Sequence, residues 1–174
     1  EGRRIDLEVL LAAAYLHDVG RLADMMPLAR AVPPESEPHA TRSVAFAREI
    51  LRGIGVFPAA KIPAVEHAIL AHSFSLGERP GSIEAMILSD ADKLDAIGAQ
   101  GIIRTVAYSV ELKRSLQDTL DHLNEKILRL KDTLYTPQAK RVAVGKHDIV
   151  VRFVDDLVQG LAGVPERASN TSSK

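Results

Sequence analysis

The sequence predicts an all-α protein built as a single helical bundle. Apolar residues recur with the 3.6-residue period of an α-helix along most of the chain. The strand-like stretches, residues 142–144 and 149–151, lie inside a longer helical pattern. With 174 residues, 46% of them hydrophobic, the chain can bury a core without the help of disulfide bonds or structural metal ions. We therefore expect one domain over residues 1–165 and a disordered polar tail over residues 166–174.

The first two helices follow from capping and stop signals. Asp6 can cap a helix whose apolar pattern continues to about Gly20. A second helix is predicted from about His39 to Leu51, because the stop signals Gly53 and Gly55 follow it. Proline and glycine clusters predict loops over residues 32–38 and 73–82.

The middle of the chain continues the helical pattern. A third helix is predicted over residues 62–72, and a long fourth segment runs from residue 83 to about residue 112. The fourth segment contains Gly98 and Gly101. Because glycine inside a helix costs about 1 kcal/mol relative to alanine, these two residues indicate either close packing or a break.

The last third of the chain holds two further predicted helices. The first carries an apolar stripe with alternating spacings of four and three residues: Leu116, Leu120, Leu123, Ile127, Leu130 and Leu134. This stripe suits the core of the chain, and it suits a homodimer contact as well. Thr136 and Pro137 then have the residue types of an N-cap and a first helical position, and they predict a final helix to about Leu161.

Composition excludes several function classes. Lys plus Arg is 22 and Asp plus Glu is 23, so a net charge of -1 argues against a nucleic-acid polymer as partner. The absence of cysteine excludes disulfides, thiolate metal sites and cysteine nucleophiles. No apolar run approaches the ~20 residues of a membrane span, and no signal peptide is visible. We expect a cytoplasmic protein that does not contact membranes.

His17 and Asp18 form the first candidate site. They follow the apolar run 10–16, so the helix that carries them is predicted to be apolar nearly all round and buried. A buried imidazole and carboxylate need partners, and a divalent metal satisfies both. The alternative is a hydrogen-bonded core histidine next to a terminal aspartate.

A second candidate site is the acidic stretch 89–95. On one continuous helix, Asp90, Lys93 and Arg104 share a face, while Asp92 lies ~200° away from Asp90. A carboxylate, a lysine and an arginine on one face suit a metal together with phosphate groups. The alternative is a solvated face with intrahelical ion pairs.

Among the other histidines, His72 is the strongest site candidate, because it lies on the apolar stripe of the third helix and ends that helix. His39 begins the second helix after the proline-rich loop. His147 and Asp148 repeat the His-Asp dipeptide, but no apolar run precedes them. His67 lies roughly 140° from His72 around the third helix and is not expected to face the same site, while His122 and His147 are expected to be structural or exposed.

Two stretches resemble a known family. Residues 12–20, Ala-Ala-Ala-Tyr-Leu-His-Asp-Val-Gly, resemble the signature of the HD-domain superfamily of metal-dependent phosphohydrolases. Residues 87–104 are more specific and look like a bacterial and archaeal branch that includes nucleotide pyrophosphohydrolases. Residues 123–132 also fit that branch. The resemblance implies an all-helical bundle of the HD-domain type with a metal in its middle.

The superfamily pattern His…His-Asp…Asp implies that His17, Asp18 and Asp90 are three of four metal ligands. The first histidine of the pattern normally lies on an upstream helix, and residues 1–16 contain none. We therefore expect that the chain lacks this upstream helix. Members with two metals use extra histidines, for which His39 and His72 are the matching candidates.

The function implied is a metal-dependent phosphohydrolase of a nucleotide or a related phosphate ester or anhydride. The ion is expected to be Mn²⁺ or Mg²⁺, with Fe²⁺, Ni²⁺ and Zn²⁺ also compatible. The expected catalytic residues are Asp18, Lys93 and His72, and the expected contacts to the phosphorylated small-molecule substrate are Lys93, Arg104 and His39. The alternative is a catalytically weakened HD fold that binds nucleotide or metal as a regulatory or interaction module.

Overall fold

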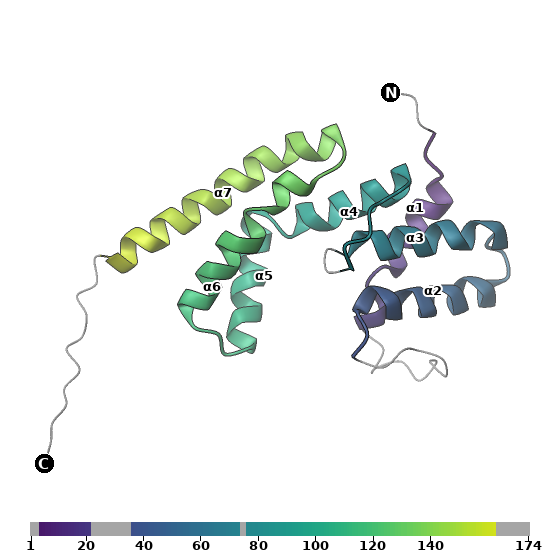
Figure 1. The fold of residues 1–174 in the computed structure, drawn as a ribbon, viewed down its shortest axis with the longest axis horizontal. Helices are drawn as coiled ribbons and strands as arrows, with labels where there is room; N and C mark the ends of the chain where they lie inside the picture. Colours follow the sequence, from purple (N-terminus) through teal and green to yellow (C-terminus); the bar gives the residue numbers. More distant parts are fainter. Residues whose placement is uncertain (1–3, 22–35, 74–75, 163–174) are drawn as a thin grey trace, which may run out of the picture. The chain divides into compact units, whose positions relative to one another are not determined.

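The computed structural model describes residues 4–21, 36–73 and 76–162 (Figure 1). These residues form helices and no strands, which confirms the all-α prediction. The predicted tail and parts of both predicted loops lie outside the described residues. The main helices are α1 (Leu7–Leu16), α2 (His39–Ile54), α3 (Ile62–His72), α4 (Ile83–Asp95), α5 (Gly98–Glu111), α6 (Leu116–His122) and α7 (Pro137–Ala162).

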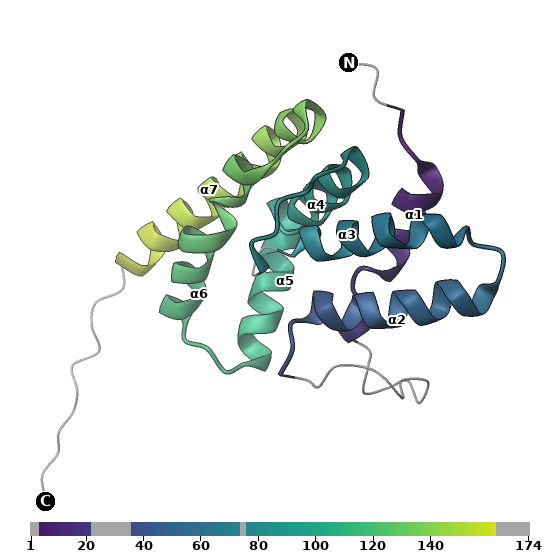
Figure 2. The ribbon, with the colours of Figure 1, turned by 45° about the vertical axis from the view of Figure 1, so that its right-hand side comes forward.

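The chain forms two compact units. The first contains residues 1–94 and residues 133–140, and the second contains residues 95–132 and the chain from Arg141 onward. In the first unit α2 and α3 lie side by side and α1 crosses them (Figure 2). Its core is apolar and is built mainly from α1, α2, α3 and α4: Val9, Ala13, Ala47, Leu51, Ile62, Val65, Ala68, Ile69, Ala71, Ala85 and Leu88.

Helix α1 confirms its predicted cap and corrects its predicted burial. The Asp6 carboxylate accepts hydrogen bonds from the amides of Glu8 and Val9. The helix ends at Leu16, before the predicted end near Gly20. Its outer face is exposed rather than buried, with Tyr15 84% exposed, because the helix packs against its neighbours only along the side that holds Val9 and Ala13.

Helices α2 and α3 match the sequence closely. Helix α2 runs through Gly53 to Ile54 and ends at Gly55, whose φ of 71° is left-handed. Helix α3 has the predicted limits, Ile62 and His72. Its final residue is therefore a histidine, as is the first residue of α2.

The long fourth segment is divided into α4 and α5. The break lies at residues 96 and 97, and Gly98 begins α5 with a φ of 81°. A Cβ on Gly101 would lie 2.1 Å from the Ala96 carbonyl oxygen, so this corner admits no side chain at that position. The prediction that Asp90, Lys93 and Arg104 share the face of one helix is therefore wrong.

The predicted fifth helix is also irregular. Helix α6 is followed by a π-helical stretch, Leu123–Ile127, and a 3₁₀ turn, Leu130–Thr133. The apolar stripe from Leu120 to Leu134 is nevertheless buried within the chain. Thr136 caps α7 through a hydrogen bond from the Ala139 amide to its hydroxyl, as predicted. Among the described helices, none combines the length and the apolar character needed to cross a bilayer.

We expect Gly20→Ala to lower the free energy of unfolding by about 1–3 kcal/mol, the usual cost of overpacking. A Cβ at Gly20 would lie 2.6 Å from both the His39 carbonyl oxygen and the Ser43 amide nitrogen, where α1 meets the start of α2. Urea unfolding measures the effect. Gly53→Ala is the matched control, since no described atom lies within 4 Å of its Cβ position. Equal stability of Gly20→Ala and the wild type would show that this close approach is absent.

Candidate metal centre

Three helix ends in the first unit bring histidines together. His17 is the C-terminal cap of α1 and Asp18 follows it, His39 begins α2, and His72 ends α3. The Nε2 atoms of His39 and His72 are 3.3 Å apart. Asp18 Oδ1 lies 3.6 Å from His39 Nε2 and 3.9 Å from His72 Nε2. His17 Nε2 lies 3.9 Å from Asp18 Oδ2, and donor atoms of His17, Asp18 and His72 all lie within 4.8 Å of one another. We call these four residues the histidine cluster.

The helices themselves orient two of the imidazoles. His17 Nδ1 donates to the Ala14 carbonyl oxygen at 2.8 Å, and His72 Nδ1 donates to the Ile69 carbonyl oxygen. With Nδ1 carrying the proton, each Nε2 presents a lone pair to the cluster. Metal-binding histidines in proteins are held by this kind of bond from the other ring nitrogen.

Asp18 supplies the acidic part of the cluster. Its Oδ1 atom is buried, and its partner among the described residues is the Arg21 guanidinium, whose Nε lies 2.8 Å away. Burial opposes the charge on Asp18, but the Arg21 guanidinium outweighs it, and with smaller contributions from His17 and His39 it holds the pKa below its usual value. The carboxylate is therefore ionised at neutral pH and lacks a full set of partners.

Two imidazoles of the cluster, those of His39 and His72, favour their neutral forms. Burial lowers the pKa of His39, and the charge of Arg21 lowers it further. Burial also lowers the pKa of His72, which is 2% exposed. Neutral imidazole is the form that binds a metal, so both residues are ready ligands at neutral pH.

The cluster fits a divalent transition metal. Ligands at the usual bond lengths of about 2.0–2.2 Å around one ion lie roughly 3–4 Å apart, which matches the distances between these donor atoms. The Asp18 carboxylate provides a negative charge for the ion. Three imidazoles and a carboxylate suit Mn²⁺, Fe²⁺, Ni²⁺ or Zn²⁺ better than Mg²⁺, which prefers oxygen ligands.

Asp90, predicted as a ligand with His17 and Asp18, lies elsewhere. It is 2% exposed, and its two oxygens accept hydrogen bonds from the amides of Tyr135 at 2.8 Å and Thr136 at 2.7 Å. Burial lowers the pKa of His39 and of His72, and among the carboxylates of α4 it is Asp92 whose charge opposes this lowering in both. The sequence places these two aspartates on opposite sides of a helix, but it contains no local signal for which side faces the histidines.

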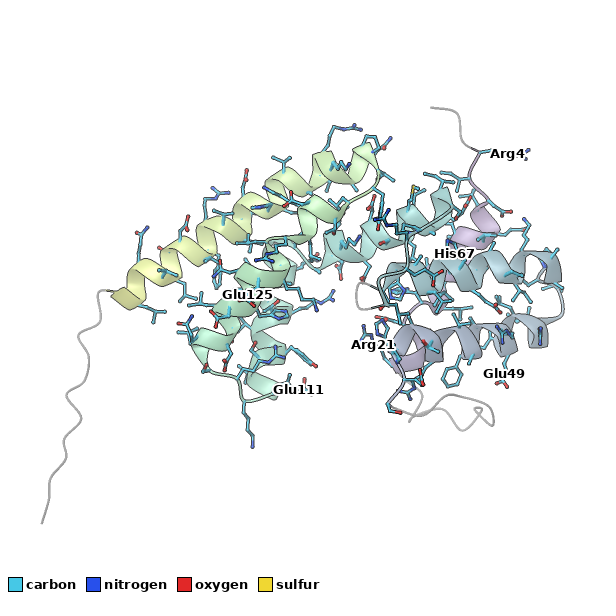
Figure 3. The ribbon with its side chains drawn as sticks, in the orientation of Figure 1. Arg4, Arg21, Glu49, His67, Glu111 and Glu125 are labelled. Carbon is cyan, nitrogen blue, oxygen red and sulfur yellow. The ribbon has the colours of Figure 1, made fainter. Side chains whose placement is uncertain are left out.

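The side chains predicted to bind the substrate phosphate, Lys93 and Arg104, contact other parts of the protein. Lys93 Nζ donates to the Thr133 carbonyl oxygen at 2.9 Å and lies 4.5 Å from the centre of the Tyr135 ring. Burial lowers the pKa of Lys93, against the opposing effect of Asp90 and Asp92. Arg104 belongs to the second unit, where it is exposed and pairs with Asp95. The cation that the structure brings to the cluster is instead Arg21, labelled in Figure 3.

The remaining histidines lie outside the cluster. His67 donates from Nδ1 to Glu78 at 3.0 Å and accepts the Gly81 amide at Nε2, so it joins α3 to the loop that follows. His122 and His147 both belong to the second unit. Asp148, next to His147, is exposed.

Comparison with known proteins places the first half of the chain in a known family. The model of the HD domain family matches residues 1–97, which include the whole histidine cluster and Asp92. A curated relative, the uncharacterized protein YpgQ of Bacillus subtilis (strain 168), is 30% identical over 179 residues, covering 97% of this chain and 80% of the relative.

Solved structures resemble the chain over most of its length. The crystal structure of B. subtilis YpgQ in complex with ADP has a TM-score of 0.62 at 26% identity, covering 91% of this chain and 88% of that one. An HD-superfamily hydrolase from Bacillus thuringiensis has a TM-score of 0.61 at 29% identity, covering 90% of this chain and 74% of that one.

We expect Mn²⁺ to raise the melting temperature of the wild type, and Asp18→Asn to abolish most of this shift. An ion present at 100 times its Kd stabilises the folded state by about 2.7 kcal/mol. Differential scanning fluorimetry with and without the ion measures the shift. Asp148→Asn is the matched control, because it alters the second His-Asp dipeptide, and it should keep the wild-type shift. A shift retained in Asp18→Asn would remove Asp18 from the metal centre.

The metal-free protein should lose stability as the pH falls below about 6.5, the ordinary pKa of histidine. The pKa values of His39 and His72 are lowered in the folded state, so the unfolded chain binds more protons in this range and the free energy of unfolding falls with pH. Urea unfolding at several pH values between 7.5 and 5 measures the slope. His72→Gln should flatten it, while His122, whose pKa burial also lowers, contributes equally in both proteins. An unchanged slope in His72→Gln would contradict this assignment.

Proposed function

The chain belongs to the HD-domain family, and from that premise we propose that it is a metal-dependent phosphohydrolase whose substrate is a nucleotide or a related phosphate compound. One observation carries the proposal: imidazoles from three helix ends, those of His17, His39 and His72, place their Nε2 atoms 3.6 to 3.9 Å from the Asp18 carboxylate. Arg21 already pairs with this carboxylate, and a divalent ion beside it would be held by nitrogen ligands, two of which are oriented by backbone hydrogen bonds.

We assign the metal ligands as the histidine cluster together with Asp92. When bound, a divalent ion would polarise a phosphoryl group of the substrate and lower the pKa of a water molecule toward neutral pH. The residues of this chain have distinct tasks around it. The backbone bonds of His17 and His72 hold the ring orientations, and the negative charges of Asp18 and Asp92 offset the charge of the ion.

The substrate phosphate would be held chiefly by Arg21. This side chain is 57% exposed and reaches the cluster at Asp18, so it can turn toward an anion without leaving a buried gap. A guanidinium can donate two parallel hydrogen bonds to phosphate oxygens, which orients the reacting group as well as neutralising it. Lys93 and Arg104, expected earlier for this task, contact Thr133 and Asp95, whereas the contact of Arg21 is with Asp18, a member of the histidine cluster.

A nucleotide is the substrate class that the relatives favour. YpgQ, 26% identical in its solved form, was crystallised with ADP. The test is a screen of nucleoside mono-, di- and triphosphates against the purified protein with Mn²⁺, Mg²⁺, Co²⁺ and Ni²⁺, in which released phosphate and pyrophosphate are measured separately. Hydrolysis of none of them by the metal-loaded protein, with nucleotide binding retained, would favour the regulatory or interaction module instead.

With the best substrate, Asp92→Asn should lower kcat/KM by at least about 100-fold, because it removes a charged ligand from the metal centre. Asp95→Asn is the matched control, since it makes the same change on the same helix at an exposed position whose partner is Arg104. It should retain activity within about twofold. Equal losses in the two variants would point to damage to α4 rather than to the loss of a ligand.

A further inference from the structure

Two buried side chains of α4 form hydrogen bonds with residues 133–136, the segment that precedes α7. Asp90 binds the amides of Tyr135 and Thr136, and one turn later Lys93 binds the carbonyl oxygen of Thr133. Residues 133–136 thus contribute two donors to the carboxylate and one acceptor to the ammonium group. We call these contacts the α4 clamp.

The clamp is strong enough to set the rotation of the helix. Asp90 is 2% exposed and Lys93 is 5% exposed, and the two hydrogen bonds of Asp90, at 2.8 and 2.7 Å, have the short lengths of charge-assisted bonds. The Lys93 ammonium group also lies over the Tyr135 ring. A small rotation of α4 would leave a buried carboxylate and a buried ammonium group without partners, which is costly.

This rotation matters for the histidine cluster because Asp92 is on the same helix. Two residues along an α-helix correspond to about 200°, so turning Asp90 toward residues 133–136 turns Asp92 to the opposite side. Asp92 is partly exposed, and its charge acts on His39 and His72. We infer that Asp90 and Lys93 are positioning residues, which hold α4 so that Asp92 faces the metal centre.

The inference rests on the proposed role of Asp92 as a metal ligand, and it differs from a direct role for Asp90 or Lys93. Were Asp90 itself a ligand, removing Lys93 would leave the ligand set intact. Were Lys93 merely a nearby positive charge, removing it would leave the affinity for a cation unchanged or increase it. A positioning role predicts the opposite, a loss of metal affinity when Lys93 becomes neutral.

The decisive variant is therefore Lys93→Met, which keeps the length of the side chain and removes its charge and its hydrogen bond. The readouts are Mn²⁺ affinity by isothermal titration and the visible absorption spectrum of the Co²⁺-loaded protein, neither of which requires turnover. We expect a Kd at least fivefold higher than that of the wild type and an altered Co²⁺ spectrum. Lys93→Arg serves if Lys93→Met does not fold. It keeps the charge, and a loss of metal affinity is again expected, because Lys93 is 5% exposed and the larger guanidinium cannot occupy this position without displacing α4 or residues 133–136.

Asp90→Asn and Asp90→Ala provide a graded test. The single amide oxygen of Asn can keep one of the two backbone hydrogen bonds, so the Asn variant should bind metal less tightly than the wild type and more tightly than the Ala variant. Asp95→Asn is the control for a carboxylate lost from α4 outside the clamp, and it should bind as the wild type does.

The outcomes separate the inference from the proposed function. An unchanged or tighter Kd in Lys93→Met, with affinity lost in Asp92→Asn, would overturn the inference and leave the proposed function standing. An unchanged Kd in Asp92→Asn would overturn both, because Asp92 would then not be a ligand. Weaker binding in Lys93→Met and in Asp92→Asn, with wild-type binding in Asp95→Asn, is the expected result.

Discussion

The structure of the first unit depends on one interaction, the placement of an ionised carboxylate among imidazoles. The ionised Asp18 carboxylate lies 3.6 Å from His39 Nε2 and 3.9 Å from His72 Nε2, and its buried Oδ1 atom pairs with Arg21 Nε at 2.8 Å. Such a group is costly without compensation. The ends of α1, α2 and α3 meet around it, so the packing of these three helices and the chemistry of the cluster satisfy the same constraint.

Helix ends suit this task for a physical reason. A side chain at the end of a helix can extend beyond the last turn and contact side chains at the ends of neighbouring helices. The helical hydrogen bonds still hold its backbone in place. In α1 and α3 the carbonyl oxygen three residues earlier also binds Nδ1 of the terminal histidine. Each helix therefore supplies both a ligand and the bond that orients it, and the apolar side chains of the same helices form the core that keeps the ends in place.

The two sides of helix α4 have different partners. One side holds residues 133–136 through Asp90 and Lys93, and the other carries Asp92, whose charge acts on the histidines. Because both sides of α4 carry charged residues, the stretch 89–95 holds three aspartates and a lysine within seven residues. Opposite charges and backbone groups satisfy the buried members, and the exposed Asp95 pairs with Arg104.

The amino-acid pattern alone correctly predicted the helical class, the caps at Asp6 and Thr136 and the limits of α3, because periodicity and capping are local properties. It also singled out His17, Asp18 and His72 as site candidates, whose roles stay predictions. It could not decide that Asp92 rather than Asp90 acts on the cluster, that Arg21 reaches Asp18, or that one side of α1 is exposed. Those outcomes depend on partners distant in the chain, such as the amides of Tyr135 and Thr136. These outcomes became visible in the folded structure alone. Helical geometry establishes which residues share a face of a helix, but it does not establish which other part of the chain packs against that face.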